Sequence, residues 1–217
     1  MSREFRRRAR LVPDEYCTNS LLSYPRSGNH LLRFLIESST GRPTLGAIDR
    51  ESFALPVGLH DLPVYLAIRG MRVKDVRPII VKRHWVNDDE AFDKTIFLVR
   101  EPVEAILSHL RDCTEDEFRE QAPIELALFR NNENHFEKLP EESKLGVHYE
   151  DLVTDGASTM RSVLSFLIPS AQISEKATNS ALARVPNAYA ALQRAASEDP
   201  RRYREIFPGR ATFLESL

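Results

Sequence analysis

The chain has 217 residues, of which 42% are hydrophobic and 29% charged, a balance that is ordinary for a globular protein with a buried core. Its formal net charge of −2 argues against general binding of nucleic acid, so a basic site must be local. The two cysteines, Cys17 and Cys113, give no disulfide framework and no metal-ligand spacing. No apolar run is long enough to span a membrane, and the arginine-rich residues 3–10 contain no apolar signal core. We therefore expect a cytoplasmic protein, with residues 3–10 as a solvated tail rather than a contact for a membrane or an acidic partner.

Short apolar runs alternate with longer helical segments along the chain. The runs predict strands near residues 19–24, 78–83, 94–99 and 144–149. The segments between and after them predict helices over residues 28–39, 102–111, 123–138, 156–167 and 171–183. We expect Pro123 to start the third of these helices and Pro140 to follow its end. Connections of this length join parallel strands, and no linker or repeat interrupts the chain. Residues 1–217 are therefore predicted to form a single α/β domain around a parallel sheet.

Two stretches have no clean period. Residues 41–76 contain Pro43, Pro56 and Pro63, and irregular stretches of this length in compact domains are often functional loops. Their place between the first two predicted strands leads us to assign them to substrate binding. Residues 184–210 are also irregular and are rich in Arg and Ala.

The segment 24–36 has the layout of an anion site. A short turn with the sequence Pro-Arg-Ser-Gly leads from an apolar strand end into an apolar helix, which Gly41 should terminate. The first N–H groups of a helix are unpaired, and its dipole favours negative charge there. Arg26 adds a positive charge, and Ser27 and Asn29 add side-chain hydrogen bonds. The turn therefore predicts a phosphate or sulfate site, with an ordinary surface turn as the alternative.

Two further segments carry basic residues at the ends of predicted strands. Arg100 follows the strand 94–99, Pro102 suits the first turn of the next helix, and Ser108 lies about two turns into it. Arg100 and Ser108 are thus predicted to hold a second anion. The run Ile79–His84 delivers Lys82 and His84 at its carboxyl end. Because ligands of open α/β sheets bind at the carboxyl ends of the strands, all these groups should meet at one edge.

Taken together, these segments resemble the sulfotransferases that use 3′-phosphoadenosine 5′-phosphosulfate (PAPS). Residues 25–28 look like the family's loop for the 5′-phosphosulfate, and Arg100 to Ser108 match its Arg-x-Pro-x-x-x-x-x-Ser element. Lys82-Arg83-His84 matches the family's Lys-x-His, and Tyr149 begins a Tyr-Glu-Asp-Leu stretch like the one in the family. The four segments come in the family's order. The resemblance implies a three-layer α/β sandwich with a central parallel sheet, like that of P-loop NTPases.

The resemblance also implies a role for each site residue. His84 is the catalytic base, while Lys82 and Arg26 stabilise charge on the bridging oxygen and on the leaving 5′-phosphate. The 5′-phosphosulfate is bound by the turn residues Arg26, Ser27, Gly28, Asn29 and His30. The 3′-phosphate is bound by Arg100 and Ser108, and the adenine lies against Tyr149. PAPS is then the co-substrate, 3′-phosphoadenosine 5′-phosphate (PAP) is the product, and no metal is required.

The chain departs from the family pattern at two places. Asn29 and His30 stand where the family has hydroxyl residues, so we expect backbone contacts to dominate there. The family's C-terminal Arg-Lys-Gly clamp on the 3′-phosphate is absent, and Phe207-Pro208-Gly209-Arg210 is the nearest match. Arg210, or Arg204 upstream of it, is the candidate for that charge.

The acceptor is predicted least well. We expect a small soluble molecule or a sugar hydroxyl, and a homodimer is possible. Trp85 either lines the acceptor pocket or belongs to the core, and His60 is more often solvated in such a loop. The remaining histidines, His109, His135 and His148, are expected to be structural. Two other functions remain: a small-molecule P-loop kinase, which lacks its Gly-x-x-x-x-Gly-Lys-Ser/Thr sequence here, and a catalytically silent nucleotide-binding scaffold.

Overall fold

A four-stranded parallel sheet organises the part of the chain that the computed structural model describes, residues 18–42, 44, 78–86, 92–184 and 203–217. The strands are β1 (Asn19–Leu22), β2 (Val81–Arg83), β3 (Lys94–Val99) and β4 (Lys144–His148). All neighbouring strands pair in parallel, with Leu21 opposite Lys82 on one side and Ile96 on the other. The four predicted strands are confirmed, although β1, β2 and β4 are shorter than predicted.

The strand order β2-β1-β3-β4 creates a switch point at β1. From β1 the chain first forms β2 on one side and then β3 on the other. β2 and β3 therefore lie on opposite sides of β1, and in open α/β sheets ligands bind at the carboxyl ends of the strands at such a point. The three predicted anion-binding and basic segments follow these three strands.

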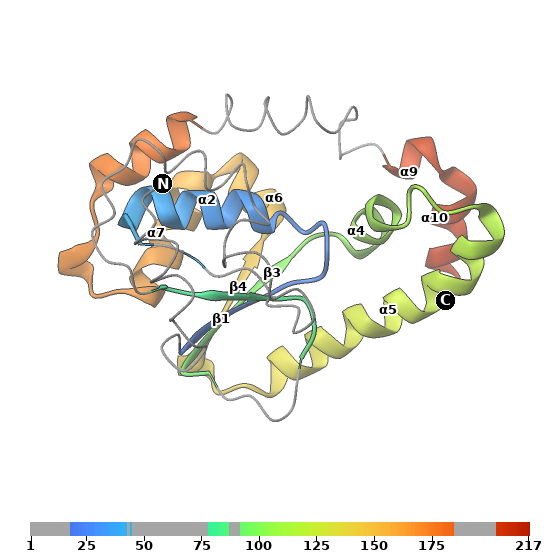
Figure 1. Cartoon of the computed structure of the whole chain (residues 1–217), viewed down its shortest axis with the longest axis horizontal. Coiled ribbons are helices and arrows are strands. Elements are labelled where there is room, and N and C mark those ends of the chain that lie inside the picture. Colours follow the sequence, from blue (N-terminus) through green and yellow to red (C-terminus); the bar gives the residue numbers. More distant parts are fainter. Residues whose placement is uncertain (1–17, 43, 45–77, 87–91, 185–202) are drawn as a thin grey trace, which may run out of the picture.

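Helices cover both faces of the sheet (Figure 1). Leu21, Ile96 and Leu98 share one buried cluster with residues of α2 (Asn29–Thr40), α6 (Tyr149–Thr154) and α7 (Gly156–Leu167). The alternate side chains Leu22 and Phe97 pack with Phe136 of α5 (Glu115–Lys138) on the opposite face. Because side chains alternate along a strand, each face has its own helical layer. The predicted three-layer α/β fold is confirmed.

The two helices that follow β1 and β3 lie close to the predicted ranges, although the first is shifted by one residue and the second ends two residues earlier than predicted. α2 begins after Gly28 and ends at Gly41, whose left-handed backbone (φ 69°) lets its N–H donate to the Glu37 carbonyl. α4 (Pro102–His109) begins after Glu101, whose carboxylate accepts from the backbone N–H groups of residues 103 and 104. Both helix N-termini are therefore fixed in place at the strand ends.

The predicted start of the helix at Pro123 is wrong. α5 begins eight residues earlier, at Glu115, and Pro123 lies inside it. The start is set by a capping box, in which the Thr114 hydroxyl accepts from the Glu117 N–H and the Glu117 carboxylate accepts from the Thr114 N–H. Pro123 is exposed on the outer side of the helix, where the structure tolerates the missing N–H donor.

The remaining elements refine the prediction. α6 was not predicted, because its six residues directly follow β4. Instead of one helix over 171–183, a 3₁₀ turn (Ser170–Gln172) precedes helical residues 175–184. Part of the stretch predicted to be irregular forms α9 (Tyr203–Ile206) and the start of α10 (Pro208–Glu215), and both pack on α4 in a cluster that includes Tyr203, Ile106 and Leu214. Among the described residues, no helix is long and apolar enough to cross a membrane.

Candidate active site

The turn between β1 and α2 is built to present backbone N–H groups. Arg26 and Gly28 both have left-handed backbone conformations, with φ of 67° and 94°. No side chain caps the N-terminus of α2, where the first N–H groups of a helix have no partner within the helix. The buried Ser27 hydroxyl also has no hydrogen-bond partner among the described residues. The turn therefore offers several donors to one anion.

Arg100 and Ser108 lie against this turn, as the sequence predicts. The Arg26 Nε donates to Ser108 Oγ at 3.2 Å, and the Arg100 Nη1 donates to the Arg26 carbonyl at 3.1 Å. The backbone at Arg26 has a φ of 67°, a left-handed conformation that residues with side chains disfavour. Arg100 is 4% exposed and forms an ion pair with Glu104 at 3.6 Å. The structure thus joins the two predicted anion sites into one continuous group.

Tyr149 closes one side of the turn. Its ring lies so close to Gly28 that a Cβ atom at that position would be 2.4 Å from Tyr149 Cδ2. The Arg100 guanidinium lies 5.2 Å from the centre of the same ring. The Tyr149 ring, only 7% exposed, therefore packs against both the glycine turn and the Arg100 guanidinium.

His84 follows β2 and faces the same turn. Its Nδ1 lies 2.9 Å from the Ser23 carbonyl, which can only accept, so Nδ1 carries the proton and Nε2 has a free lone pair. Burial, with a contribution from cationic Lys82, lowers the pKa of His84 to about 4. The Asn132 side chain donates to the His84 carbonyl at 2.8 Å and holds the residue from α5. His84 is therefore a neutral, oriented imidazole at pH 7.

A cluster of basic side chains surrounds this point. Burial and the guanidinium of Arg33 lower the pKa of Lys82 to about 8. The pKa of His30 is lowered to about 4, first by desolvation and then by Lys82, Arg33 and Arg26. The concentration of positive charge favours binding of an anion with several charges.

Arg33 is a member of this cluster that we did not predict. It is 1% exposed in the middle of α2, and its Nε donates to the Thr44 hydroxyl at 2.7 Å. The Thr44 N–H in turn donates to the Glu37 carboxylate at 2.8 Å. The signal available in the sequence was an arginine inside the apolar run 31–36. A buried arginine at such a place needs a polar network, and this one lies beside Lys82.

Arg210 is not brought to the site, and this corrects the expected clamp. It donates to the carbonyls of Leu110 and Cys113 and to the Glu115 carboxylate, at 3.3, 2.8 and 3.1 Å. These contacts use its guanidinium to join α10 to the turn between α4 and α5. Arg204, the other candidate, binds Glu101 at 2.8 Å and also pairs with Glu215. Of the two arginines, only Arg204 contacts a residue adjacent to Arg100.

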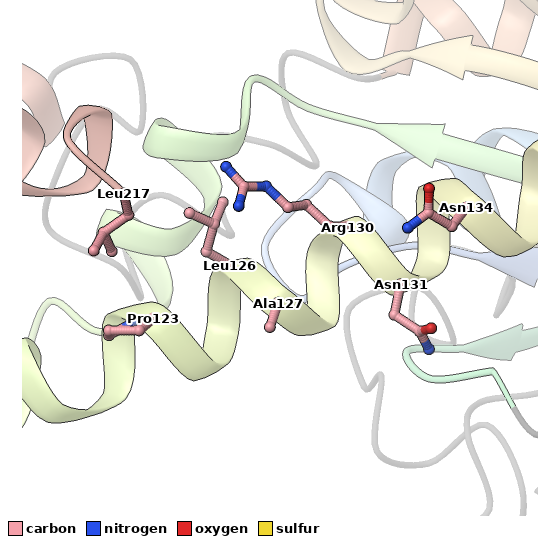
Figure 2. Close-up of a pocket in the computed structure, with 7 residues that line it drawn as sticks. All are labelled: Pro123, Leu126, Ala127, Arg130, Asn131, Asn134 and Leu217. Carbon is pink, nitrogen blue, oxygen red and sulfur yellow. The ribbon is translucent and has the colours of Figure 1, made fainter.

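Of the two other residues considered for the acceptor site, Trp85 and His60, the structure describes only Trp85. Trp85 is 43% exposed, so it is not a core residue. His60 and nearly all of the predicted substrate loop, residues 43 and 45–76, lie outside the described residues. A pocket of about 410 Å³ is lined by residues of α5 and by the C-terminal Leu217, and contains none of the predicted site residues (Figure 2). It is lined by Pro123, Leu126, Ala127, Arg130, Asn131, Asn134 and Leu217.

Part of the chain is similar in sequence to a curated protein. No protein-family model matches the chain. A WSCD family member from Aedes aegypti is 29% identical over 167 residues, which are 68% of this chain and 49% of that protein. The chain therefore spans about half the length of the curated relative it matches.

Three solved structures are similar in fold. Retinol dehydratase, in complex with androsterone and the inactive cofactor PAP, has a TM-score of 0.50 and 15% identity over 84% of this chain and 69% of its own. Mouse sulfotransferase SULT7A1, complexed with PAP, has a TM-score of 0.48 and 18% identity over 83% and 69% of the two chains. The sulfotransferase domain of the Synechococcus PCC 7002 olefin synthase has a TM-score of 0.48 and 21% identity over 70% and 72%. The described part of this chain has the α/β fold of the sulfotransferases.

Proposed function

We propose that this protein is a sulfotransferase that moves a sulfuryl group from PAPS to a hydroxyl or amine of a small-molecule or sugar acceptor. One observation carries the proposal. Arg100 and Ser108 meet Arg26 at the N-terminus of α2, and the neutral base His84 stands at the end of the neighbouring strand. A donor with two separate phosphate groups needs two joined anion sites, and an acceptor hydroxyl needs a base.

Each part of the donor has a matching group in this arrangement. The N–H groups at the N-terminus of α2, which no side chain caps, suit the 5′-phosphosulfate together with Arg26 and Lys82. The planar fork of Arg100 suits the doubly charged 3′-phosphate, and the Ser108 hydroxyl adds a hydrogen bond. Tyr149 offers its ring to the adenine. The PAP in the retinol dehydratase structure supports this choice of nucleotide, because that protein shares the fold.

The proposed chemistry is an in-line displacement. The acceptor oxygen forms a bond to sulfur while the bond from sulfur to the bridging oxygen breaks, and PAP leaves with that electron pair. His84 takes the acceptor's proton on Nε2, because its Nδ1 already donates to the Ser23 carbonyl. Lys82 stabilises the negative charge that develops on the bridging oxygen. Sulfuryl transfer, like phosphoryl transfer, relies mainly on positioning and charge stabilisation, and these are what the basic cluster supplies.

A small-molecule kinase is the nearest alternative, and the site favours it less. A P-loop kinase places Lys and then Ser or Thr after the glycine, where this chain has Asn29 and His30. The Asn29 side chain donates to the Ser23 hydroxyl, and His30 carries no charge at pH 7 because its pKa is about 4. A silent scaffold would have no need of an oriented neutral imidazole beside a lysine.

Transfer to acceptors tests the proposal. Wild-type protein incubated with PAPS and a panel of alcohols, phenols, sugars and amines should add the mass of one sulfuryl group to at least one of them. His84→Ala should lower kcat on that acceptor on the order of 10²–10⁴-fold while PAP binding stays nearly unchanged, since general base catalysis is a rate effect. His148→Ala is the matched control, because His148 is exposed at the end of β4. A His84→Ala variant with normal kcat on an unactivated alcohol would contradict the assigned base.

A further inference from the structure

One mostly buried carboxylate, bound to the Tyr24 hydroxyl, is not used by the proposed reaction. Glu125 of α5 is 13% exposed, and its Oε2 accepts from the Tyr24 hydroxyl at 2.8 Å. Its Oε1 lies 3.9 Å from the His109 Nε2, beyond hydrogen-bond distance. The Glu125 carboxylate lowers the acidity of Tyr24, whose pKa is raised by burial first and then by this hydrogen bond, so Tyr24 remains a donor.

Contiguous ring contacts connect this carboxylate to His84. Tyr24 directly follows Ser23, whose carbonyl binds the His84 ring. The Tyr24 ring packs edge-on against both Trp85 and His109, with centroids 6.2 and 5.7 Å apart. His84 and Trp85 are themselves in contact, with centroids 6.1 Å apart. The rings of Tyr24, His84, Trp85 and His109 and the Glu125 carboxylate therefore form one continuous surface, which we call the acceptor wall.

Part of this wall is exposed to solvent. Trp85 is 43% exposed and the His109 side chain is 34% exposed, whereas Tyr24 is buried beneath them. His109 is also close enough to His84 that its charge contributes to the lowered pKa of His84. A molecule that presents a hydroxyl to His84 would thus lie against Trp85 and His109, with the Glu125 carboxylate at the edge of the same surface.

The carboxylate has capacity for another donor. An ionised carboxylate accepts about four hydrogen bonds, and Glu125 receives one from a described residue, Tyr24. Among the described residues, no lysine or arginine pairs with it, and the nearest basic group is His109. A mostly buried carboxylate gains when donors satisfy its remaining lone pairs. A ligand that brings such a donor would be bound more tightly than one that does not.

We propose that Glu125 determines acceptor specificity by accepting a hydrogen bond from a second donor group on the acceptor. The favoured acceptor carries a neighbouring hydroxyl or an ammonium beside the hydroxyl that receives the sulfuryl group. Trp85 supplies an apolar face for the ring that joins the two groups. An acceptor with an anionic group at that position is disfavoured by the carboxylate. This inference rests on the proposed sulfotransferase function and names the class of its acceptor.

Matched acceptors and variants test the inference. The acceptors are cyclohexanol, cis-1,2-cyclohexanediol and 2-aminocyclohexanol, with PAPS as donor and kcat and KM measured for each. Wild-type protein should prefer at least one bifunctional acceptor over cyclohexanol by about tenfold or more in kcat/KM, the value of one charge-assisted hydrogen bond. Glu125→Leu should remove this preference. Glu125→Gln keeps an oxygen acceptor without charge, so it should spare a preference for the diol but not one for the amino alcohol.

The controls separate specificity from folding and from the proposed reaction. Glu120→Gln changes an exposed glutamate of the same helix and should leave the preference intact. All variants should bind PAP as the wild type does, which shows that the fold and donor site are preserved. A wild type that transfers sulfuryl groups without preference, or a Glu125→Leu variant that keeps the preference, overturns the inference and leaves the sulfotransferase function standing. A wild type that transfers to no acceptor in either panel overturns the function itself.

Discussion

His84 and Lys82 lie two residues apart at the end of β2, and burial shifts their pKa values downward together. His84, with a pKa of about 4, is neutral at pH 7, while Lys82, with a pKa of about 8, keeps most of its positive charge. A neutral imidazole can accept a proton, and an ammonium can stabilise negative charge. The same buried environment thus prepares one residue as a base and the other as a cation.

These pKa values predict a bell-shaped pH dependence for kcat/KM of the free enzyme. Activity should rise as His84 loses its proton near pH 4 and fall as Lys82 loses its charge near pH 8. Lys82→Met should lower kcat and abolish the alkaline limb. It should also move the acid limb to higher pH, because the Lys82 charge is one cause of the low pKa of His84. Initial rates from pH 4 to 9.5 measure this.

Lys176→Met serves as the control for this experiment, since Lys176 is exposed and far along the chain from β2. Its profile should match that of the wild type. A Lys82→Met variant with an unchanged alkaline limb would mean that Lys82 is a solvated strand-end lysine, and it would end the charge-stabilising role assigned to it.

Residue types and spacing predicted that the basic segments gather at one edge of the sheet, because strand ends carry their side chains to a common edge. Arg26, Arg100 and Ser108 do lie together there. Arg210 could not be assigned correctly from its position in the sequence. An arginine binds whichever carbonyls and carboxylates the packed helices bring to it, and for Arg210 these belong to the turn between α4 and α5. Arg33 was missed because the partner that makes its burial possible, Thr44, lies in an irregular segment.

At the scale of elements, the turn from β1 to α2 depends on a glycine for two separate reasons. The backbone at Gly28 has a φ of 94°, which side chains disfavour, and the Tyr149 ring lies where a Cβ atom would be. Tyr149 comes from α6, which follows β4 at the other end of the sheet order. The turn and the aromatic surface are therefore held together by a contact that tolerates no side chain.

We predict that Gly28→Ala lowers the free energy of unfolding by about 1–3 kcal/mol, through backbone strain and overpacking. It should also weaken PAP binding, because Tyr149 must move away from the turn. Gly209→Ala is the matched control: nothing lies within 4 Å of a Cβ there, and the residue is in the first turn of α10. Urea unfolding and titration with PAP measure both effects. Equal stability of the two alanine variants would show that the Gly28 turn can relax without cost.

Helix ends were predicted best where one residue fixes the backbone geometry at that position. Pro102 and Gly41 mark helix ends through backbone geometry alone, and both positions were correct. Pro123 was misread because proline favours a first helical turn on average, while the actual start is fixed by the capping box of Thr114 and Glu117. That capping box was available in the sequence and is a stronger signal than the proline.

At the scale of the whole molecule, the order of the strands is what makes one site from distant segments. β1 lies between β2 and β3, so the glycine turn, His84 and Arg100 come from three adjacent strands. The hydrophobic pattern predicted parallel strands but contains no information on which of them are neighbours. Strand order depends on long-range packing of both faces, with Leu21 toward α2 and Leu22 toward α5.

The joined anion sites make a specific demand on the ligand, and titration calorimetry with PAP, AMP and magnesium-ATP tests it. The wild type should bind PAP at least about tenfold more tightly than AMP, since the 3′-phosphate adds one or more charge-assisted hydrogen bonds worth about 1.5–3 kcal/mol each. Arg100→Met should lose most of this margin. Arg204→Met, which changes an exposed arginine paired with Glu101 and Glu215, should keep it. Equal affinity of the wild type for PAP and AMP, or tighter binding of magnesium-ATP than of PAP, would contradict the sulfotransferase site.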